Sequence, residues 1–138
     1  MMQIDDPRVR SALLDQVAFG DQGFIAAIAQ DHHTKAVLML AWMDRDALDE
    51  TLKTGQVVYY SRSRKSLWRK GETSGQTQTL VDIHLDCDRD AVLLSILQEG
   101  VACHTGRTSC FSWQPQSGEW KASAPVMIDP SSLYGDGK

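Results

Sequence analysis

The segment 79–87 is predicted to form a β-strand, because its side chains alternate in character with a period of two. One face of the segment would carry apolar residues and a cysteine, and the other would be mostly polar. The first set is Val81, Ile83, Leu85 and Cys87, and the second is Leu80, Asp82, His84 and Asp86. This alternation is typical of a strand in a sheet with one buried face. The chain is therefore expected to build a β-sheet.

Other segments give more strands than helices. β-branched and aromatic content predicts further strands at 24–29, 36–41, 57–60, 91–97 and 111–113. The run 91–97 fits a strand or a short helix, and we favour a strand. Helices are expected at 5–18 and after Asp44, a good N-cap, with Gly55 ending the second helix. Residues 61–75 and 100–107 are expected to be loops. This order predicts an α+β fold with a mixed, largely antiparallel sheet and few short helices.

The length of 138 residues favours one domain. Hydrophobic residues make up 42% and charged residues 23%, which is an ordinary globular balance. We divide the chain into an N-terminal extension (1–19), a central domain (20–114) and a C-terminal tail (115–138). The tail contains Pro125, Pro130 and terminal glycines, and is expected to be poorly ordered or peripheral.

The net charge of −4 and the pI of about 5.4 argue against a general nucleic-acid binder, which needs a basic face. No stretch reaches the ~20 apolar residues needed to span a membrane. The N-terminus has no signal-peptide pattern, so a cytoplasmic location is expected. One local cluster is strongly basic, however, and suggests a small anionic ligand. It consists of Arg62, Arg64, Lys65, Arg69 and Lys70.

The three cysteines, Cys87, Cys103 and Cys110, all lie within 24 residues and all have polar neighbours. Three thiolates would leave one position open on a tetrahedral zinc, which is the arrangement of a catalytic site. The spacing alone is a weak signal, because there is no C-x-x-C. The alternative for any single cysteine is a small buried apolar side chain.

Asp86, Asp88 and Asp90 form the pattern D-x-D-x-D on an expected turn. Three carboxylates at this spacing can converge on a hard cation such as Mg²⁺. An EF-hand loop is excluded, because Ala91 stands at its glycine position and Leu97 at its glutamate position. The alternative is a solvated polar turn. Asp86 and Cys87 should point to opposite faces of the strand, so the segment could supply two separate metal sites.

The basic segment also suggests a phosphate site. Arginine binds phosphate through two parallel hydrogen bonds, lysine adds charge, and serine adds a hydroxyl. Trp68 would stack on a base or pack the loop down. The segment has no P-loop pattern, and a solvated loop is the alternative reading. The residues expected to contact substrate are Arg62, Arg64, Trp68, Arg69, Lys70, Ser74 and, between the last two cysteines, Arg107.

With these motifs the sequence resembles the phosphoribosyl-AMP cyclohydrolase family. The resemblance covers roughly residues 20–113. It rests on the stretches SRSR (61–64), LWRKGETSG (67–75), LDCDRD (85–90), ACHTGRTSCF (102–111) and, with Trp42 where the family more often has Tyr, LMLAWM (38–43). The residues before 20 and after 113 have no counterpart in this resemblance.

The resemblance implies a hydrolase that opens the adenine ring of 1-(5-phosphoribosyl)-AMP at the N1–C6 bond, a step of histidine biosynthesis. It implies one zinc per subunit on Cys87, Cys103 and Cys110, and Mg²⁺ at Asp86, Asp88 and Asp90. It also implies an intertwined homodimer in which Cys87 of one chain joins Cys103 and Cys110 of the other. Relatives that carry a second catalytic domain are longer, so a single activity is expected.

The expected chemistry is attack of zinc-activated water on C6, since zinc lowers the pKa of bound water toward ~7. A general acid–base must then carry a proton to the leaving nitrogen. His104 is the first choice because it follows a zinc ligand, and His84 is the second because it should share a face with Asp86. A structural role is the alternative for either histidine.

Two other classes of protein are weighed against this reading. A structural zinc module for nucleic acid would need four protein ligands and a basic surface. A thiol redox protein would need a close cysteine pair with a lowered pKa. The sequence offers three cysteines, a negative net charge and no C-x-x-C.

Overall fold

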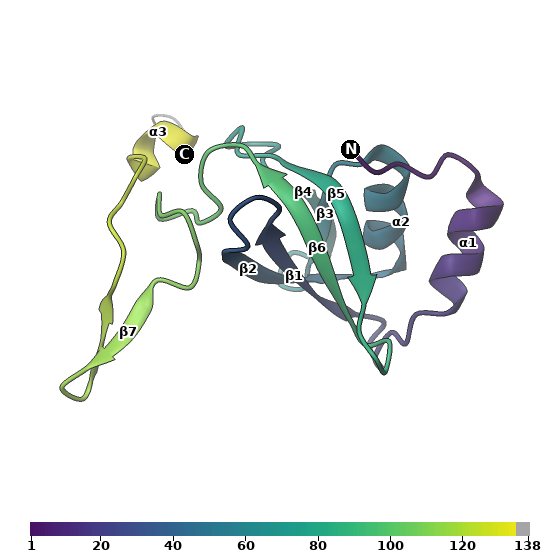
Figure 1. Cartoon of the computed structure of the whole chain (residues 1–138), viewed down its shortest axis with the longest axis horizontal. Helices are drawn as coiled ribbons and strands as arrows, with labels where there is room; N and C mark the ends of the chain where they lie inside the picture. The colour runs from purple at the N-terminus through teal and green to yellow at the C-terminus, as the bar shows by residue number, and fades with distance from the viewer. Residues whose placement is uncertain (135–138) are drawn as a thin grey trace.

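The computed structural model describes residues 1–134, and Figure 1 shows the arrangement of its elements. A four-stranded sheet with two helices on one side forms the body, as the α+β prediction requires. In chain order the elements are α1 (Pro7–Asp15), β1 (Ile25–Asp31), β2 (Val37–Met43), α2 (Arg45–Thr54), β3 (Val58–Ser61), β4 (Ser66–Arg69), β5 (Gln78–Leu85), β6 (Ala91–Gln98), β7 (Trp113–Gln116), β8 (Glu119–Ala122) and α3 (Pro130–Tyr134).

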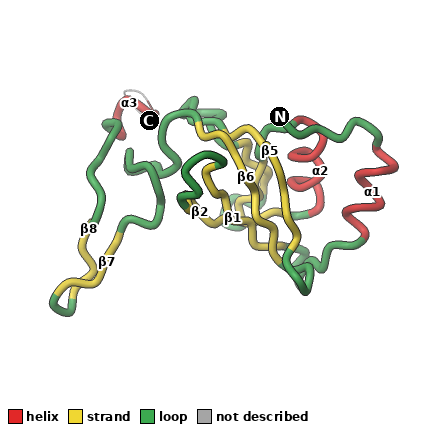
Figure 2. Tube along the Cα trace, in the orientation of Figure 1, coloured by secondary structure: helices red, strands yellow, loops and turns green. Residues whose placement is uncertain are grey.

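The main sheet has the strand order β2-β1-β6-β5. The pairs β1–β2 and β5–β6 are antiparallel, and the central pair β1–β6 is parallel. The expected mixed, largely antiparallel sheet is therefore confirmed. Two small antiparallel pairs, β3–β4 and β7–β8, complete the strands (Figure 2).

The core lies between one face of the sheet and α2. Leu94 and Ile96 of β6 are fully buried there with Leu48 and Leu52 of α2. The ends of α2 are those that the sequence predicts. The Asp44 carboxylate accepts a hydrogen bond from the Ala47 amide at 2.8 Å, and Gly55 ends the helix with φ of 73°.

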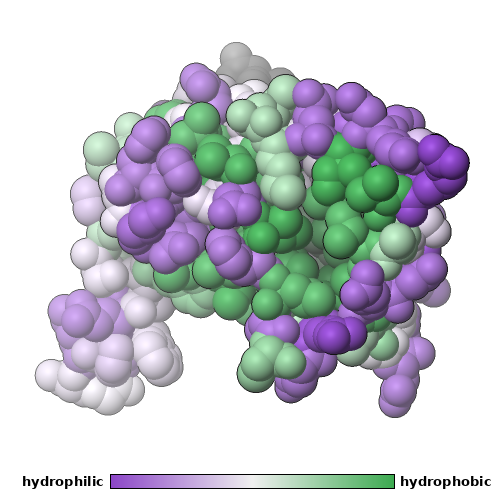
Figure 3. All heavy atoms as spheres, turned by 45° about the vertical axis from the view of Figure 1, so that its right-hand side comes forward, coloured by the Kyte–Doolittle hydropathy of each residue, from purple (hydrophilic) through white to green (hydrophobic). Residues whose placement is uncertain are grey.

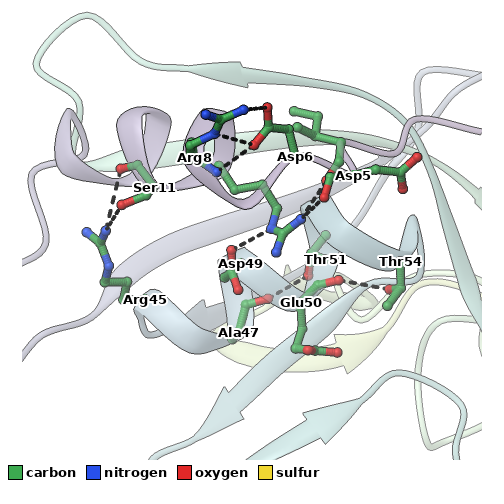
Figure 4. A network of polar contacts seen from close by, with 12 residues as sticks. Asp5, Asp6, Arg8, Ser11, Arg45, Ala47, Asp49, Glu50, Thr51 and Thr54 are labelled. Carbon is green, nitrogen blue, oxygen red and sulfur yellow. Dashed lines mark hydrogen bonds and ion pairs between the residues drawn. The ribbon is translucent and has the colours of Figure 1, made fainter.

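The expected N-terminal extension packs against α2 through α1. The guanidinium of Arg10, which is almost fully buried, donates to the Asp49 carboxylate at 2.8 Å and to the carbonyls of Ile4 and Asp5 (Figure 4). An apolar cavity of about 250 Å³ lies between α1, α2 and β5. Figure 3 shows apolar side chains gathered in a hollow on the face that this view brings forward.

The alternation predicted for residues 79–87 is wrong in one respect. The register shifts between Leu80 and Asp82, so that Leu80 lies opposite Ile96 and Ile83 lies opposite Leu94. This bulge inserts one extra residue and places Leu80 on the same face as Ile83. The strand also ends at Leu85, which leaves Asp86 and Cys87 in the turn that follows.

Two segments hold more regular structure than predicted. The basic segment 61–75, expected to be a loop, contains β4, which pairs with β3. The C-terminal tail contains the exposed β7–β8 hairpin, which projects from the body in Figure 1, and the short helix α3. Residues 135–138 of the tail lie outside the described residues. No helix in the described part of the chain is long and apolar enough to cross a membrane.

Candidate active site

Three glutamines, of which Gln78 is fully buried, hold the start of the loop that follows β6. The Tyr59 hydroxyl donates to Gln78 Oε1 at 2.7 Å, and Gln78 Nε2 donates to Gln98 Oε1 at 2.8 Å. Gln76 Oε1 accepts a hydrogen bond from the Val101 amide at 2.8 Å. The chain therefore enters the segment with Cys103 and Cys110 from a fixed position.

Backbone hydrogen bonds shape the loop 101–110 itself. The Ala102 amide donates to the Thr108 carbonyl at 3.1 Å, and the Gly106 amide donates to the Cys103 carbonyl at 3.0 Å. The Cys110 amide donates to the Leu38 carbonyl of β2 at 2.7 Å, which ties the end of the loop to the edge of the main sheet. These bonds bring Cys110 back toward Cys103.

The thiols of Cys103 and Cys110 are neighbours, and each influences the protonation of the other. Burial, followed by the charge of Cys103, raises the pKa of Cys110 to about 12. Burial also acts to raise the pKa of Cys103, but hydrogen bonds from Thr105 outweigh it and leave that pKa lowered. The Thr105 hydroxyl lies 3.0 Å from Cys103 Sγ.

The structure places Lys70 beside this thiol pair. Its side chain is buried, and its Nζ donates to the Ala102 carbonyl at 2.7 Å. Burial lowers the pKa of Lys70, whereas the charges of Cys110 and Cys103 act to raise it. The sequence predicts Lys70 as a phosphate contact, but no sequence pattern could reveal that its ammonium is turned inward.

Cys87 lies at the other end of β6. It precedes the strand by four residues and Cys103 follows the strand by five. An extended strand of eight residues spans roughly 26 Å. Cys87 is exposed, and among the described residues the three cysteines of one chain form no common metal-binding group. One chain thus brings together two of the three predicted zinc ligands.

The three predicted Mg²⁺ ligands do come together. Asp86, Asp88 and Asp90 each offer a carboxylate oxygen, and these oxygens lie within 4.8 Å of one another. The Asp90 amide donates to Asp86 Oδ1 at 3.1 Å, and Arg89 adopts a left-handed conformation that closes the turn. Hydrogen bonds with Asp90 and Asp86 and their negative charges raise the pKa of Asp88 to about 6.

The basic segment lines two adjoining pockets. The first, of about 440 Å³, includes Trp42, Tyr60, Arg62, Arg64 and Trp68. The second, of about 280 Å³, includes Arg64, Trp68, Lys70 and Ser74. The two pockets therefore share Arg64 and Trp68. Five of the seven predicted substrate contacts line these pockets.

The other two predicted contacts lie elsewhere. The guanidinium of Arg69 lies 3.8 Å from the carboxylate of Glu50 on α2. Arg107 Nε donates to the Ala124 carbonyl of the tail at 2.8 Å. Sequence reasoning did not predict Trp42 as a contact, although the Arg62 guanidinium lies 4.5 Å from the centre of its ring. The feature that could have indicated Trp42 as a contact is its position, as a large aromatic residue at the end of an apolar strand.

The two predicted catalytic histidines belong to different elements. His104 is exposed in the loop after β6, directly after Cys103. His84 is exposed on β5, with Nε2 3.9 Å from the Asp82 carboxylate. His104 therefore accompanies Cys103 and Cys110, and His84 lies three residues before Cys87.

The sheet face opposite the helices carries several apolar side chains among polar ones, which include Ser95 and His84. The registers place Ile28, Leu40, Leu93 and Leu97 on this face, because none of them shares the face of Leu94 and its partners. Leu40 is 45% exposed and Leu97 is 41% exposed. Exposed apolar side chains that gather on one sheet face are typical of an interaction surface.

Comparison with known proteins identifies the family. A family model described as phosphoribosyl-AMP cyclohydrolase matches residues 39–112. The chain belongs to the phosphoribosyl-AMP cyclohydrolase family. The matched segment includes all three cysteines, the acidic turn and both pockets, so the whole candidate site lies within it.

Relatives with this name cover most of the chain. The enzyme of Granulibacter bethesdensis is 56% identical over 126 residues, which are 91% of this chain and 98% of the relative. The enzyme of Halorhodospira halophila is 56% identical over 125 residues, covering 91% and 88% of the two chains. The enzyme of Nitrosomonas eutropha is 55% identical over 122 residues, covering 88% and 95%. The resemblance inferred from the motifs is thereby confirmed.

Proposed function

We propose that this chain hydrolyses the N1–C6 bond of the adenine ring in 1-(5-phosphoribosyl)-AMP, the ring-opening step of histidine biosynthesis. One observation carries the proposal beyond family membership. The loop with Cys103 and Cys110 lies against Lys70, and Lys70 also lines one of the two arginine-containing pockets. A metal-ligating pair therefore adjoins a site suited to an anionic nucleotide.

The donor set fits a catalytic zinc. Cys103 and Cys110 are neighbours in a fixed loop, and thiolates are strong zinc ligands. Cys87 of a second chain would supply the third thiol, since Cys87 of the same chain lies at the far end of β6. When bound, zinc lowers the pKa of water and supplies a nucleophile at neutral pH.

A homodimer would complete this site. Its support is the exposed apolar side chains on one face of the main sheet, which include Leu40 and Leu97. Cys87 and His84 belong to β5 and its following turn, at the edge of the same sheet. A two-fold dimer through this surface would bury these apolar side chains and would form two identical zinc sites.

The acidic turn is proposed to hold Mg²⁺. Carboxylate oxygens are the ligands that Mg²⁺ prefers, and the oxygens of Asp86, Asp88 and Asp90 already converge. Hydrogen bonds with Asp90 and Asp86, and to a smaller extent their negative charges, raise the pKa of Asp88, and a bound cation would relieve the repulsion among these groups. The turn would then supply two metals, with Cys87 binding zinc and the three carboxylates binding Mg²⁺.

The two adjoining pockets would hold the substrate, which has two phosphates and an aromatic base. Arg62 and Arg64 would bind phosphate oxygens. Trp42 and Trp68 offer aromatic rings on which the adenine would stack. Arg107 and Ser74 would add polar contacts near the loop.

His104 is proposed to move the proton from the attacking oxygen to the leaving ring nitrogen. It is exposed beside the thiol pair, and an imidazole can accept and donate protons near neutral pH. His84 of the partner chain would be the alternative, because it lies on β5 three residues before Cys87. Variants of each histidine with intact zinc content would separate the two.

An absorbance assay on phosphoribosyl-AMP with metal-stripped and zinc-restored protein tests the proposal. Ring opening should be absent without zinc and should return when zinc is restored to one ion per chain. A structural zinc module would bind zinc without turnover. A thiol redox protein would instead form a Cys103–Cys110 disulfide and exchange it with added thiols. The cytoplasmic location stays a prediction.

A further inference from the structure

Lys70 is a buried cation without a carboxylate partner. It is 7% exposed, and none of the ion pairs formed within residues 1–134 includes it. Lysine is almost never this buried unless an opposite charge or strong acceptors compensate the loss of water. The groups around its ammonium must therefore provide that compensation.

Three kinds of group surround the ammonium. The Ala102 carbonyl accepts its hydrogen bond at 2.7 Å, and the ring of Trp68 lies 5.6 Å from Nζ. The remaining groups are the thiols of Cys110 and Cys103, which favour the charged form of the lysine. A carbonyl and an aromatic face are neutral, and no carboxylate within residues 1–134 forms an ion pair with Lys70, so the two cysteines are the acidic groups that favour its charge.

The position of the hydrogen bond also matters. Ala102 directly precedes Cys103, and its amide is bonded to the Thr108 carbonyl on the returning side of the loop. Lys70 directly follows β4, whose pairing with β3 fixes its backbone, and its own amide donates to the Val57 carbonyl at 3.0 Å. A bond from Lys70 thus ties the cysteine loop to a second, rigid element.

We infer that Lys70 is a positioning residue of the zinc site, which fixes the Cys103 loop through Ala102 and supplies the positive charge that offsets the metal-bound thiolates. Three thiolates on Zn²⁺ carry a net charge of −1, which a buried ammonium nearby would neutralise. This inference rests on the proposed zinc assignment, and it replaces the expectation that Lys70 binds a substrate phosphate.

The test compares Lys70→Met and Lys70→Gln with Lys53→Met in the full-length chain. Methionine keeps the unbranched length without charge, and glutamine keeps a donor without charge. Lys53 is exposed on α2, so its variant controls for the loss of one positive charge. Zinc affinity is measured by competition with a chromophoric chelator. Hydrogen exchange of residues 101–110 is measured on the metal-free protein.

Both Lys70 variants should bind zinc about 10- to 100-fold more weakly than the wild type, as is typical when an outer partner of a metal ligand is removed. Lys70→Met should also exchange its loop amides faster, and Lys53→Met should match the wild type. Zinc binding as tight as in the wild type in either folded Lys70 variant overturns the inference. A raised KM with unchanged zinc affinity would instead make Lys70 a phosphate contact.

Cys103→Ser, measured in parallel, separates this inference from the proposed function. If Cys103→Ser keeps its zinc, the zinc assignment itself is wrong. If Cys103→Ser loses zinc while both Lys70 variants keep full affinity, only the role of Lys70 is wrong. If the apolar side chain in Lys70→Met disturbs packing, Lys70→Gln still provides a folded variant in which to test the inference.

Discussion

The two ends of β6 carry the two halves of the proposed zinc site, and they are built differently. The loop after the strand holds Cys103, which is buried, and Cys110, which is exposed, through glutamine side chains, backbone bonds and the ammonium of Lys70. The turn before the strand leaves Cys87 and its neighbouring carboxylates exposed. One half is fixed by its own chain, and the other is free to be covered by a partner.

This difference teaches how a small domain can complete a metal site without enclosing it. A strand of eight residues separates the two halves by more than any zinc site can span. The proposed dimer would remove the problem, because the exposed half of one chain could meet the fixed half of another. The contrast predicts that changes at the two ends should affect stability differently even where they affect activity equally.

The largest effect is expected for the cysteines. Cys103→Ser and Cys87→Ser should each lower activity by at least about 10³-fold, because only two thiolates would remain for zinc. The metal-free proteins should differ, however. Cys103 is buried, so its replacement should cost about 1 kcal/mol of unfolding free energy, whereas Cys87→Ser should change it by under about 0.5 kcal/mol. Metal analysis measures the zinc content and denaturant unfolding measures the free energy of unfolding. A full zinc content in either variant would contradict the assignment of these cysteines as zinc ligands.

Mixed dimers test most directly whether the two halves of the zinc site come from different chains. Cys87→Ala and Cys103→Ala chains should each be inactive alone. After partial unfolding and remixing, random pairing should restore about a quarter of the wild-type activity, because half of the dimers would contain one intact site of two. Two affinity tags of different mass confirm that heterodimers form. Heterodimers without any activity would place each zinc within a single chain.

A Gly106→Ala variant should reveal how far the contact between the tail and the cysteine loop stabilises the protein. The φ of Gly106 is +85°, and an added Cβ would overlap the Ile128 carbonyl, which belongs to a segment bonded to the Gly106 backbone. Gly106→Ala should therefore lower the unfolding free energy by about 2–3 kcal/mol and weaken zinc binding.

Gly118→Ala is the matched control for Gly106→Ala. Gly118 has φ of +83° and open space around its Cα, so alanine there should cost only the backbone strain of about 1 kcal/mol. Equal destabilisation in both variants would show that the tail does not support the cysteine loop.

The smallest effect is expected at the acidic turn. Asp88→Asn should weaken the dependence of activity on Mg²⁺ concentration while zinc per chain stays unchanged. Without Mg²⁺ it should also raise Tm slightly at pH 7. The raised pKa of Asp88 means that its charged form destabilises the fold most above about pH 6. The benefit of removing that charge declines as the pH falls below 6 and vanishes below the unfolded pKa of roughly 4.

Asp5→Asn, at an exposed position before α1, is the control for Asp88→Asn. Brief mild chelation should remove Mg²⁺ before zinc, because carboxylates bind Mg²⁺ more weakly than thiolates bind zinc. Loss of zinc together with the Mg²⁺ response in Asp88→Asn would mean that both clusters form one site.

Local sequence determined much of the fold. Asp44 and Gly55 bound α2 because capping and left-handed backbone are properties of single residues. The strand pattern of 79–85 was sufficient to predict β5, but not the bulge after Leu80, because a bulge depends on how the partner strand is matched. β4 was missed because a charged, exposed strand has no apolar alternation to reveal it.

The sequence by itself also predicted which residues would carry the chemistry, because the side-chain type of a cysteine, aspartate or arginine limits the ligands that it can bind. Only the tertiary structure decided their grouping. It separates Cys87 from Cys103 and Cys110, gathers the three aspartates, and turns the Lys70 ammonium toward the Ala102 carbonyl rather than toward solvent. The physical reason is that sequence spacing fixes distance along the chain, whereas strand pairing and burial fix distance in space and the charges that each side chain meets.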